Sequence, residues 1–259
     1  MEIIDTHSHL YVEEFDADRE AAVERCRKVG ISRLYMPNID VPSFERMMNM
    51  VHDYPGYCFP MLGLHPTEVG KDYKEQLTKL KPHLKEGHPF TGIGEIGLDF
   101  YWDDTFREEQ YDAFAVQIDW ANEWHLPIVI HSRKAMDDTI RIVEEHSKPG
   151  LRGVFHSFGG SLEEAQRLLK LDNFYLGING VVTFKKCNLP DVLPHVPMER
   201  IVLETDCPYL TPVPYRGKRN ESSYIIYTLK KVAEIYGKPE EEVARITSAN
   251  ALNLFKRVL

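Results

Sequence analysis

The sequence has few cysteines and no excess of positive charge. Its 259 residues include only four cysteines, Cys26, Cys58, Cys187 and Cys207, which lie far apart and form no CxxC pair. This usage argues against a disulfide scaffold, so we expect reduced thiols. Lysine and arginine total 31 against 40 aspartates and glutamates, a formal charge of −9. The balance argues against nucleic-acid binding through a broad basic face, although positive charge can still be concentrated locally.

Long apolar runs are also missing. No segment approaches the roughly 20 apolar residues that a membrane-spanning helix needs. The start, MEIIDTHSHL, lacks the basic residues and long apolar stretch of a secretory signal peptide. We therefore expect a cytoplasmic protein with no membrane partner. No low-complexity linker or shift in composition divides the chain, which favours one domain over residues 1–259.

Short apolar runs alternate with amphipathic stretches along the chain. Eight runs predict strands: EIID, SRLYMPNI, YCFPMLGL, FTGIGEI, PIVIH, RGVFH, FYLGING and RIVLETD. Predicted helices include residues 73–84, 106–124, 136–146, 162–171, 224–236 and the tail PEEEVARITSANALNLFKR. Eight strands that alternate with helices over about 250 residues predict a closed, parallel (β/α)8 TIM barrel. A doubly wound open sheet is the alternative, but no glycine-rich phosphate loop follows the first strand.

Imidazole and carboxylate side chains gather at the ends of the predicted strands. The six residues are His7, His9, Glu95, His131, His156 and Asp206. The C-terminal ends of barrel strands converge on one face, so residues far apart in the chain can share a site. So many titratable groups in one mouth would repel one another and lose solvation, and bound cations relieve both costs. Six ligands, one of them a bridging carboxylate, suit two divalent ions, and such mixed sites accept Mg, Mn or Zn.

Paired divalent ions promote hydrolysis by activating a water and stabilising the oxygens of an in-line displacement. A phosphodiester is one candidate substrate, and a carbonyl or amide compound is the alternative. Arg133 follows His131 by two residues and has the guanidinium geometry that holds phosphate oxygens. Arg216 offers the same group, although a solvated surface arginine explains it equally well. His65, in LGLHP, is either a donor to the substrate or a plain turn residue before proline.

The stretch LDFYWDDTFREEQYDAF is rich in aromatic residues. Aromatic side chains in a cleft stack on nucleobases in proteins that bind single strands. We expect most of these side chains to pack the following helix against the barrel. Phe100, Tyr101 and Trp102 lie nearest the strand end and are therefore the candidates for a wall of the cleft.

Seven motifs, in order along nearly the whole chain, resemble those of the TatD family of metal-dependent deoxyribonucleases, in the amidohydrolase-like barrel superfamily. The motifs are DTHSHL, GLHP, GIGEIGLDF, PIVIHSR, GVFHSFGG, VLETDCPYL and RGKRNE. The resemblance implies a (β/α)8 fold, a divalent metal centre and exonuclease activity on DNA, commonly at single-stranded ends. It also implies that one ion is held by His7, His9, Glu95 and Asp206. Glu95 would bridge to a second ion, held by His131 and His156.

The same resemblance assigns the catalytic and substrate-binding roles. It implies that Asp206 orients or deprotonates the attacking water and that His65 and Arg133 contact the scissile phosphate. The sequence departs from the family pattern at Ser157, where cysteine is common, and at Ser222, where proline is common. Neither departure removes an expected ligand, although the second bears on how the last loop lines the cleft.

Two other functions are compatible with parts of this pattern. A metallohydrolase of the same fold would cleave an ester, lactone or amide in a small molecule or an aminoacyl-tRNA. A non-catalytic scaffold built on a barrel would be marked by loss of one or more ligands, and here every expected ligand is present.

Overall fold

The computed structural model describes residues 1–257 and contains one parallel sheet of eight strands in the order β1 to β8. The strands are β1 (Ile3–Asp5), β2 (Ile31–Pro37), β3 (Cys58–Leu62), β4 (Gly92–Asp99), β5 (Ile128–Arg133), β6 (Gly153–Phe155), β7 (Phe174–Ile178) and β8 (Ile201–Leu203). The first and last strands meet through a backbone hydrogen bond from Thr6 to Leu203, 3.1 Å long, and a bridge between Ser8 and Cys207. The predicted (β/α)8 barrel is confirmed.

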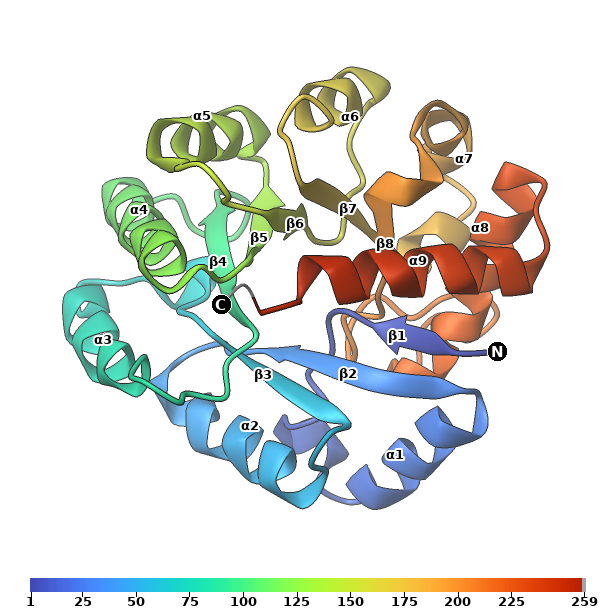
Figure 1. Cartoon of the computed structure of the whole chain (residues 1–259), viewed down its shortest axis with the longest axis horizontal. Helices are drawn as coiled ribbons and strands as arrows, with labels where there is room; N and C mark the ends of the chain where they lie inside the picture. The colour runs from blue at the N-terminus through green and yellow to red at the C-terminus, as the bar shows by residue number, and fades with distance from the viewer. Residues whose placement is uncertain (258–259) are drawn as a thin grey trace.

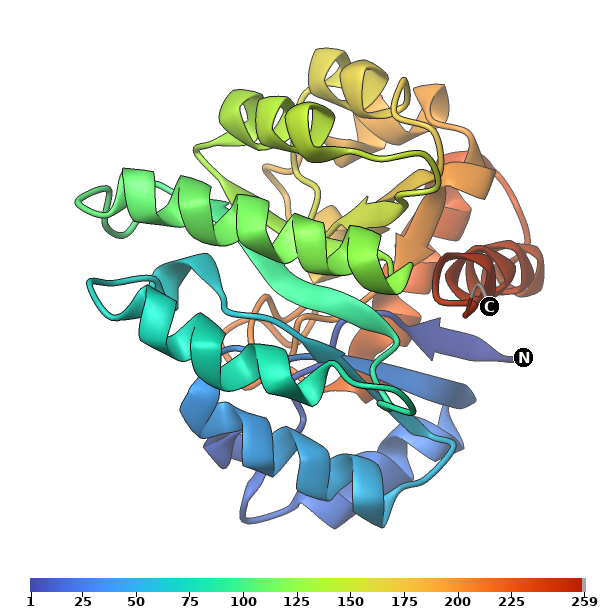
Figure 2. The same cartoon turned by 60° about the vertical axis from the view of Figure 1, so that its left-hand side comes forward.

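Helices form the outer layer around the strands (Figure 1). They are α1 (Arg19–Lys28), α2 (Val41–Asp53), α3 (Tyr73–Leu80), α4 (Arg107–Trp124), α5 (Met136–His146), α6 (Leu162–Leu168), α7 (Leu189–Val192), α8 (Ile225–Tyr236) and α9 (Glu240–Leu254). Figure 2 shows α3 and α4 side by side on the outside of the barrel. Within residues 1–257, every helix is too short or too polar to cross a lipid bilayer.

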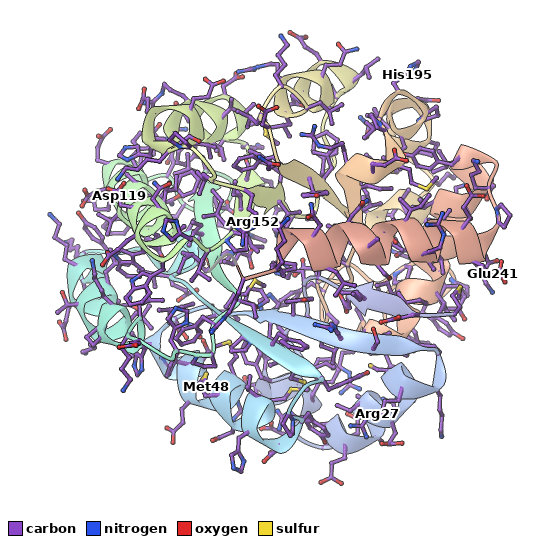
Figure 3. The ribbon with its side chains drawn as sticks, viewed as in Figure 1. Arg27, Met48, Asp119, Arg152, His195 and Glu241 are labelled. Carbon is purple, nitrogen blue, oxygen red and sulfur yellow. The ribbon has the colours of Figure 1, made fainter. Side chains whose placement is uncertain are left out.

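The end of the barrel where the strands begin is closed by α9, which crosses it in Figure 1. The barrel interior is filled there by apolar side chains from the strands and from the end of α9, among them Ile4, Tyr35, Val129, Val154, Val202, Leu254 and Phe255. The Tyr35 and Phe255 rings stack with their centroids 4.0 Å apart. Arg152, labelled in Figure 3, donates from Nε to the Leu254 carbonyl at 2.7 Å. With this end sealed, the open mouth lies at the opposite, C-terminal ends of the strands, where barrel enzymes build their sites.

Strand β4 extends further than the sequence pattern indicated. The predicted fourth strand, FTGIGEI, ends at Ile96, whereas β4 continues to Asp99 and shifts its register against β5 between Ile93 and Ile96. Gly97 permits this close pairing, because a Cβ there would lie 2.0 Å from the His131 carbonyl oxygen. Gly94 and Gly97 therefore both lie inside a strand, and that strand carries two buried carboxylates, Glu95 and Asp99.

Candidate metal centre

The barrel brings the six predicted ligand residues into one cluster at its open mouth. His7 and His9 directly follow β1, Glu95 lies within β4, His131 lies within β5, His156 follows β6, and Asp206 lies three residues beyond β8. Glu95 is at the centre of the cluster and is only 2% exposed. His7 and Asp206, 199 positions apart in the sequence, thus share one site, as the barrel topology predicts.

The two carboxylate oxygens of Glu95 face different groups of histidines. Oε2 lies 3.0 Å from Nε2 of His7 and 3.6 Å from Nε2 of His9. Oε1 lies 3.0 Å from Nδ1 of His131 and 2.9 Å from Nε2 of His156. A carboxylate that bridges two cations needs this division, with one oxygen turned toward each set of ligands.

Asp206 joins the first of these groups. Its Oδ1 lies 3.6 Å from Nε2 of both His7 and His9, and those two nitrogens are 3.1 Å apart. Two imidazole nitrogens at this distance cannot both carry a proton without bringing two N–H groups against each other. A divalent cation fits this donor set, because it would satisfy the nitrogen lone pairs and the neighbouring carboxylates together.

A tyrosine outside the cluster fixes the orientation of His9. Nδ1 of His9 lies 2.8 Å from the Tyr11 hydroxyl, which itself donates to the Pro37 carbonyl at 2.6 Å. Because the hydroxyl has only one proton, it accepts the bond from His9, and Nδ1 therefore carries the imidazole proton. Nε2 of His9 is left with a lone pair that faces the cluster, as metal ligation requires.

Two buried carboxylates lie behind the second group. Asp99 Oδ2 is 2.8 Å from Nε2 of His131, on the far side of the ring from Glu95. Glu204 is fully buried, and its Oε1 lies 3.3 Å from Nδ1 of His156. A carboxylate hydrogen-bonded behind an imidazole, as Asp99 is behind His131, holds the ring in place and favours the tautomer whose lone pair faces a metal. Nδ1 of His156 has no hydrogen-bond partner, so Glu204 acts on that ring through its charge.

The sequence interpretation missed these three outer partners. Tyr11 and Glu204 each lie two positions from a predicted ligand, and Asp99 lies four positions from one. Glu95 and Asp99 lie four positions apart in β4, a spacing that places two side chains on the same face of a strand, so this period was the one sequence signal that could have indicated Asp99.

His65 differs from the other histidines in the way its ring is held. It precedes the short 3-10 helix Pro66–Glu68, and its Nδ1 accepts a hydrogen bond from the Thr67 backbone N–H at 3.2 Å. Nδ1 also lies 2.7 Å from the Thr67 hydroxyl, so Thr67 holds the ring through both its backbone and its side chain. Nε2 lies 3.2 Å from Glu95 Oε1, so His65 presents a hydrogen-bond donor to the site rather than a lone pair.

Burial and mutual repulsion set the charges in the cluster. Burial raises the pKa of Asp206 to about 6, against the attraction of the neighbouring His156. Burial also acts to raise the pKa of Glu95, but the positive charges of His156 and His65 outweigh it and hold that pKa well below its usual value. Burial lowers the pKa of His7 well below its usual value. Burial acts to lower the pKa of His156, but the charges of Glu95 and Glu204 outweigh it and hold that pKa well above its usual value. Because imidazoles bind a cation in their unprotonated form, an ion that binds there displaces the proton of His156.

A further buried carboxylate, that of Asp5, joins β1 to the segment after β8. Asp5 accepts hydrogen bonds from the Thr205 backbone N–H at 3.0 Å and from the Thr205 hydroxyl at 2.6 Å. It also accepts from the His7 backbone N–H at 3.2 Å. These bonds position the backbone after β1 and after β8, next to the ligand residues His7 and Asp206.

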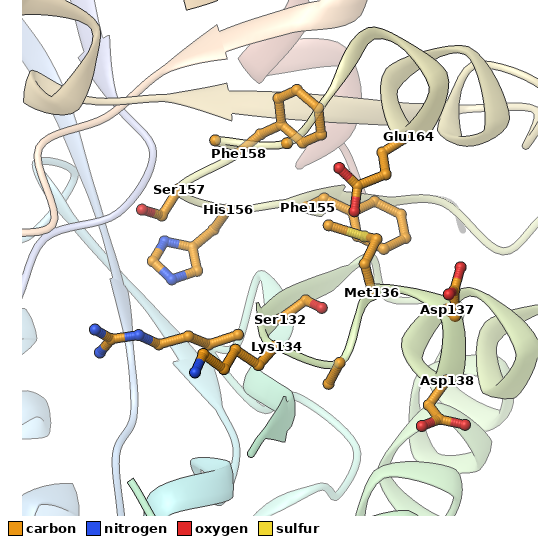
Figure 4. Close-up of a pocket in the computed structure, with 14 residues that line it drawn as sticks. Ser132, Lys134, Met136, Asp137, Asp138, Phe155, His156, Ser157, Phe158 and Glu164 are labelled. Carbon is orange, nitrogen blue, oxygen red and sulfur yellow. The ribbon is translucent and has the colours of Figure 1, made fainter. Parts of the chain in front are cut away.

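The cluster lies at the bottom of a cavity of about 580 Å³, whose lining includes His65, Trp102, Arg133, Val181 and Tyr209. A second cavity of about 590 Å³ lies beside it, between the loops after β5 and β6, and shares Arg133 and His156 with the first. Figure 4 shows His156 and Lys134 on one side of this second cavity, and Asp137 and Asp138 on the other. Arg133 is thus exposed where the two cavities meet.

Arg216, the other arginine considered from the sequence, lies away from the cluster. Its guanidinium stacks on the Phe184 ring, 3.6 Å from the centroid, and it is not among the residues that line either large cavity. The geometry therefore favours Arg133 over Arg216 as the arginine closest to the site.

The barrel and its histidine–carboxylate cluster together define a metal-dependent hydrolase of the (β/α)8 class. The family model for TatD related DNases matches residues 4–256. The chain is 39% identical over 255 residues to the uncharacterized metal-dependent hydrolase YabD of Bacillus subtilis (strain 168), covering 98% of this chain and 99% of that protein. The chain therefore belongs to the TatD family of metal-dependent hydrolases.

Two other relatives bear on fold and activity. The crystal structure of YjjV, a TatD homolog from Escherichia coli K12, matches with a TM-score of 0.91 and 29% identity, over 98% of this chain and 97% of that chain. The chain is also 29% identical over 260 residues to a protein of Pectobacterium parmentieri (strain WPP163) named 3'-5' ssDNA/RNA exonuclease TatD, covering 98% of this chain and 99% of that protein.

Proposed function

We propose that this protein is a divalent-metal-dependent exodeoxyribonuclease that removes nucleotides from single-stranded DNA ends at a two-ion site. The observation that carries the proposal is the division of the Glu95 carboxylate between two sets of imidazole nitrogens, at 2.9–3.6 Å. The name of the Pectobacterium relative supports a nucleic-acid substrate and a single-stranded end.

In this proposal one ion is held by His7, His9, Glu95 and Asp206, and a second by Glu95, His131 and His156. Mg, Mn and Zn are all compatible with this mixture of imidazole and carboxylate donors. Divalent ions bound there would supply Lewis acidity, which stabilises negative charge on phosphate oxygens and eases deprotonation of the attacking water.

Three side chains of the chain itself act on the substrate. Asp206 orients the attacking water and takes its proton on a carboxylate oxygen as the new P–O bond forms and the bond to the leaving sugar oxygen breaks. His65 donates its Nε2 proton in a hydrogen bond to a phosphate oxygen. Arg133 holds phosphate oxygens with its guanidinium, which is exposed at the cavity mouth.

The charge of the chain bears on how the substrate is held. A formal charge of −9 predicts modest affinity for DNA at physiological salt, because most of the surface repels phosphate. DNA binding would then depend on the few cations, and on the side chains that hold them, at the barrel mouth. We further infer that residues 1–259 act as one domain, since all eight strands contribute to one barrel. The cytoplasm is the compartment that we propose for it.

The proposal is tested by digesting an end-labelled single-stranded oligodeoxynucleotide with chelator-stripped protein to which Mg, Mn or Zn is added back separately. We expect a ladder that shortens from one end, and no products from Glu95→Ala. Glu241→Ala is the matched control, because Glu241 is an exposed glutamate at the start of α9 (Figure 3). An RNA strand of the same sequence tests the choice of nucleic acid.

Normal DNA cleavage by Glu95→Ala would contradict the proposed site. Absence of cleavage with every metal, although the protein binds metal, would instead favour the same-fold alternative, a hydrolase of an ester, lactone or amide. A panel of such esters, including an aminoacyl-tRNA, would then identify the substrate class.

A further inference from the structure

Two large aromatic side chains are exposed in the loop that follows β4. Trp102 is 70% exposed and Tyr101 is 45% exposed, and Trp102 is the most exposed of the large apolar side chains within residues 1–257. Large aromatic side chains bury well, and exposing them together at the rim of a cavity is typical of a binding surface. Phe100, the preceding residue, is buried and supports the loop from below.

The main chain of this loop is tied to the metal centre. Asp99 Oδ1 accepts hydrogen bonds from the backbone N–H groups of Tyr101, at 2.9 Å, and Trp102, at 3.4 Å. The other oxygen of Asp99 is bonded to His131. One buried carboxylate therefore positions both a candidate metal ligand and the two exposed aromatic residues.

Arg133 packs against the same aromatic pair. Its guanidinium lies 3.8 Å from the centroid of the Tyr101 ring and 5.1 Å from that of Trp102. The Nζ atom of Lys134 lies 5.1 Å from the Tyr101 centroid. Trp102 and Arg133 both line the cavity above the ligand cluster, so the aromatic group and the cations border the space that a substrate enters.

The charges around Trp102 distinguish which part of a nucleotide fits there. Trp102 also lines a small cavity of about 190 Å³ together with Glu68 and Asp103. These carboxylates disfavour a phosphate group on that side. On the other side of Trp102, the cation Arg133 and the neighbouring exposed Lys134 favour a phosphate.

We propose that Trp102, Tyr101 and Arg133, which we call the aromatic shelf, form a stacking subsite for the base of the nucleotide next to the scissile phosphate. Trp102 takes the uncharged base, while Arg133 holds the adjoining phosphate. This inference rests on the proposed nuclease function and adds a reason for single-stranded ends, because a base stacked on a protein ring must leave its own duplex stack.

The test combines a Trp102→Ala substitution with removal of the base. Cleavage rates are measured on a normal single-stranded oligonucleotide and on one whose last two residues at the digested end are abasic. We expect Trp102→Ala to raise KM for the normal strand about tenfold, as loss of one base–aromatic stack predicts. Trp102→Phe, which keeps a ring, should recover most of this loss. The abasic end should raise the KM of the wild type by a similar factor. Trp102→Ala acting on the abasic strand should show no larger increase in KM than either change alone.

Leu252→Ala is the control, since Leu252 is an exposed apolar residue on α9, at the opposite end of the barrel. Equal KM values for Trp102→Ala and the wild type would overturn the shelf. So would increases in KM that multiply when the base and the Trp102 ring are both removed.

A binding measurement separates failure of the shelf from failure of the nuclease proposal. Trp120 is buried and Trp124 is half-buried, so Trp102 is the tryptophan open to a stacked base. We expect a single-stranded oligonucleotide with cleavage-resistant phosphorothioate linkages to quench tryptophan fluorescence of the metal-loaded wild type but not of Trp102→Ala. Quenching without cleavage by the metal-loaded wild type would refute the nuclease proposal alone, whereas cleavage without quenching would refute the shelf alone.

Discussion

Asp99 and Glu95 hold the imidazole of His131 between them. Nε2 of His131 lies 2.8 Å from Asp99 Oδ2, and Nδ1 lies 3.0 Å from Glu95 Oε1. Asp99 is 1% exposed, so its charge is not screened by solvent on that side. The ring is thereby held with one nitrogen bonded to a buried carboxylate and the other turned to the candidate metal site.

We expect Asp99→Ala to weaken binding of one divalent ion by about 10- to 100-fold, the usual effect of losing a carboxylate behind a ligating histidine. The fold should persist, because Asp99 and His131 lie at the barrel mouth rather than in the packed core. Competition with a chromophoric chelator measures the affinity, and a circular dichroism melt checks the fold. Asp172→Ala, which removes an exposed carboxylate in the loop before β7, is the control. Unchanged metal affinity in Asp99→Ala would show that Asp99 does not support a ligand.

Tyr11→Phe should affect the other ion. Without the hydroxyl, Nδ1–H of His9 loses its acceptor, and the ring is free to place its proton on the nitrogen that faces Asp206 and Glu95. We expect a titration of two bound ions to show weaker binding of one in Tyr11→Phe and of the other in Asp99→Ala. The double variant should then lose affinity at both. Weakening of the same ion by both substitutions would contradict the division of ligands between two sites.

Barrel architecture and site composition were both predictable from the sequence, for physical reasons. Alternating strand and helix patterns specify a parallel sheet, and a parallel barrel brings the C-terminal ends of all its strands to one face. His131, which lies within β5, and His156, which follows β6, could therefore be placed together although 25 residues separate them.

The course of β4 and the outer hydrogen bonds could not be obtained in the same way. The predicted fourth strand, FTGIGEI, ends at Ile96, just before Gly97, and glycine is usually unfavourable within strands. Here Gly97 is required by the close approach of the His131 carbonyl, a contact between strands that one strand's sequence does not reveal. The orientations of the His9 and His65 rings depend likewise on local contacts with Tyr11 and Thr67.

Divalent metal should stabilise the folded protein. The cluster concentrates ionisable groups in a buried space, and an ion that binds only the folded chain adds about 2.7 kcal/mol at 100 times its Kd. For a chain of this size we expect Tm to rise by about 5–10 °C over the chelator-treated protein. Glu95→Ala should lose most of the rise, while Glu241→Ala should retain it. A Tm that is insensitive to every divalent ion would argue that the cluster is structural rather than metal-binding.

A group of ion pairs links α1 and its leading loop to the segment after β8. Asp18 accepts hydrogen bonds from Arg219 at 2.7 and 2.9 Å and from Arg25 at 2.9 Å, and Arg25 also bonds Glu221. These arginines hold the pKa of Asp18 well below its usual value. Since Asp18 and both arginines are about one-third exposed, solvent screens the group, and we assign it about 1 kcal/mol of stability.

The sign of the pH dependence follows from that lowered pKa. The folded protein binds a proton at Asp18 less readily than the unfolded chain, so the stabilisation is complete above the unfolded pKa of about 3.9 and is lost as the pH falls further. Asp18→Asn should therefore be about 1 kcal/mol less stable at pH 7. Its difference from the wild type should shrink below about pH 4. Urea unfolding in chelator at pH 7, 5, 4 and 3 measures this difference, with Asp172→Asn as the control. A difference that stays constant down to pH 3 would mean that Asp18 contributes through packing rather than through its charge.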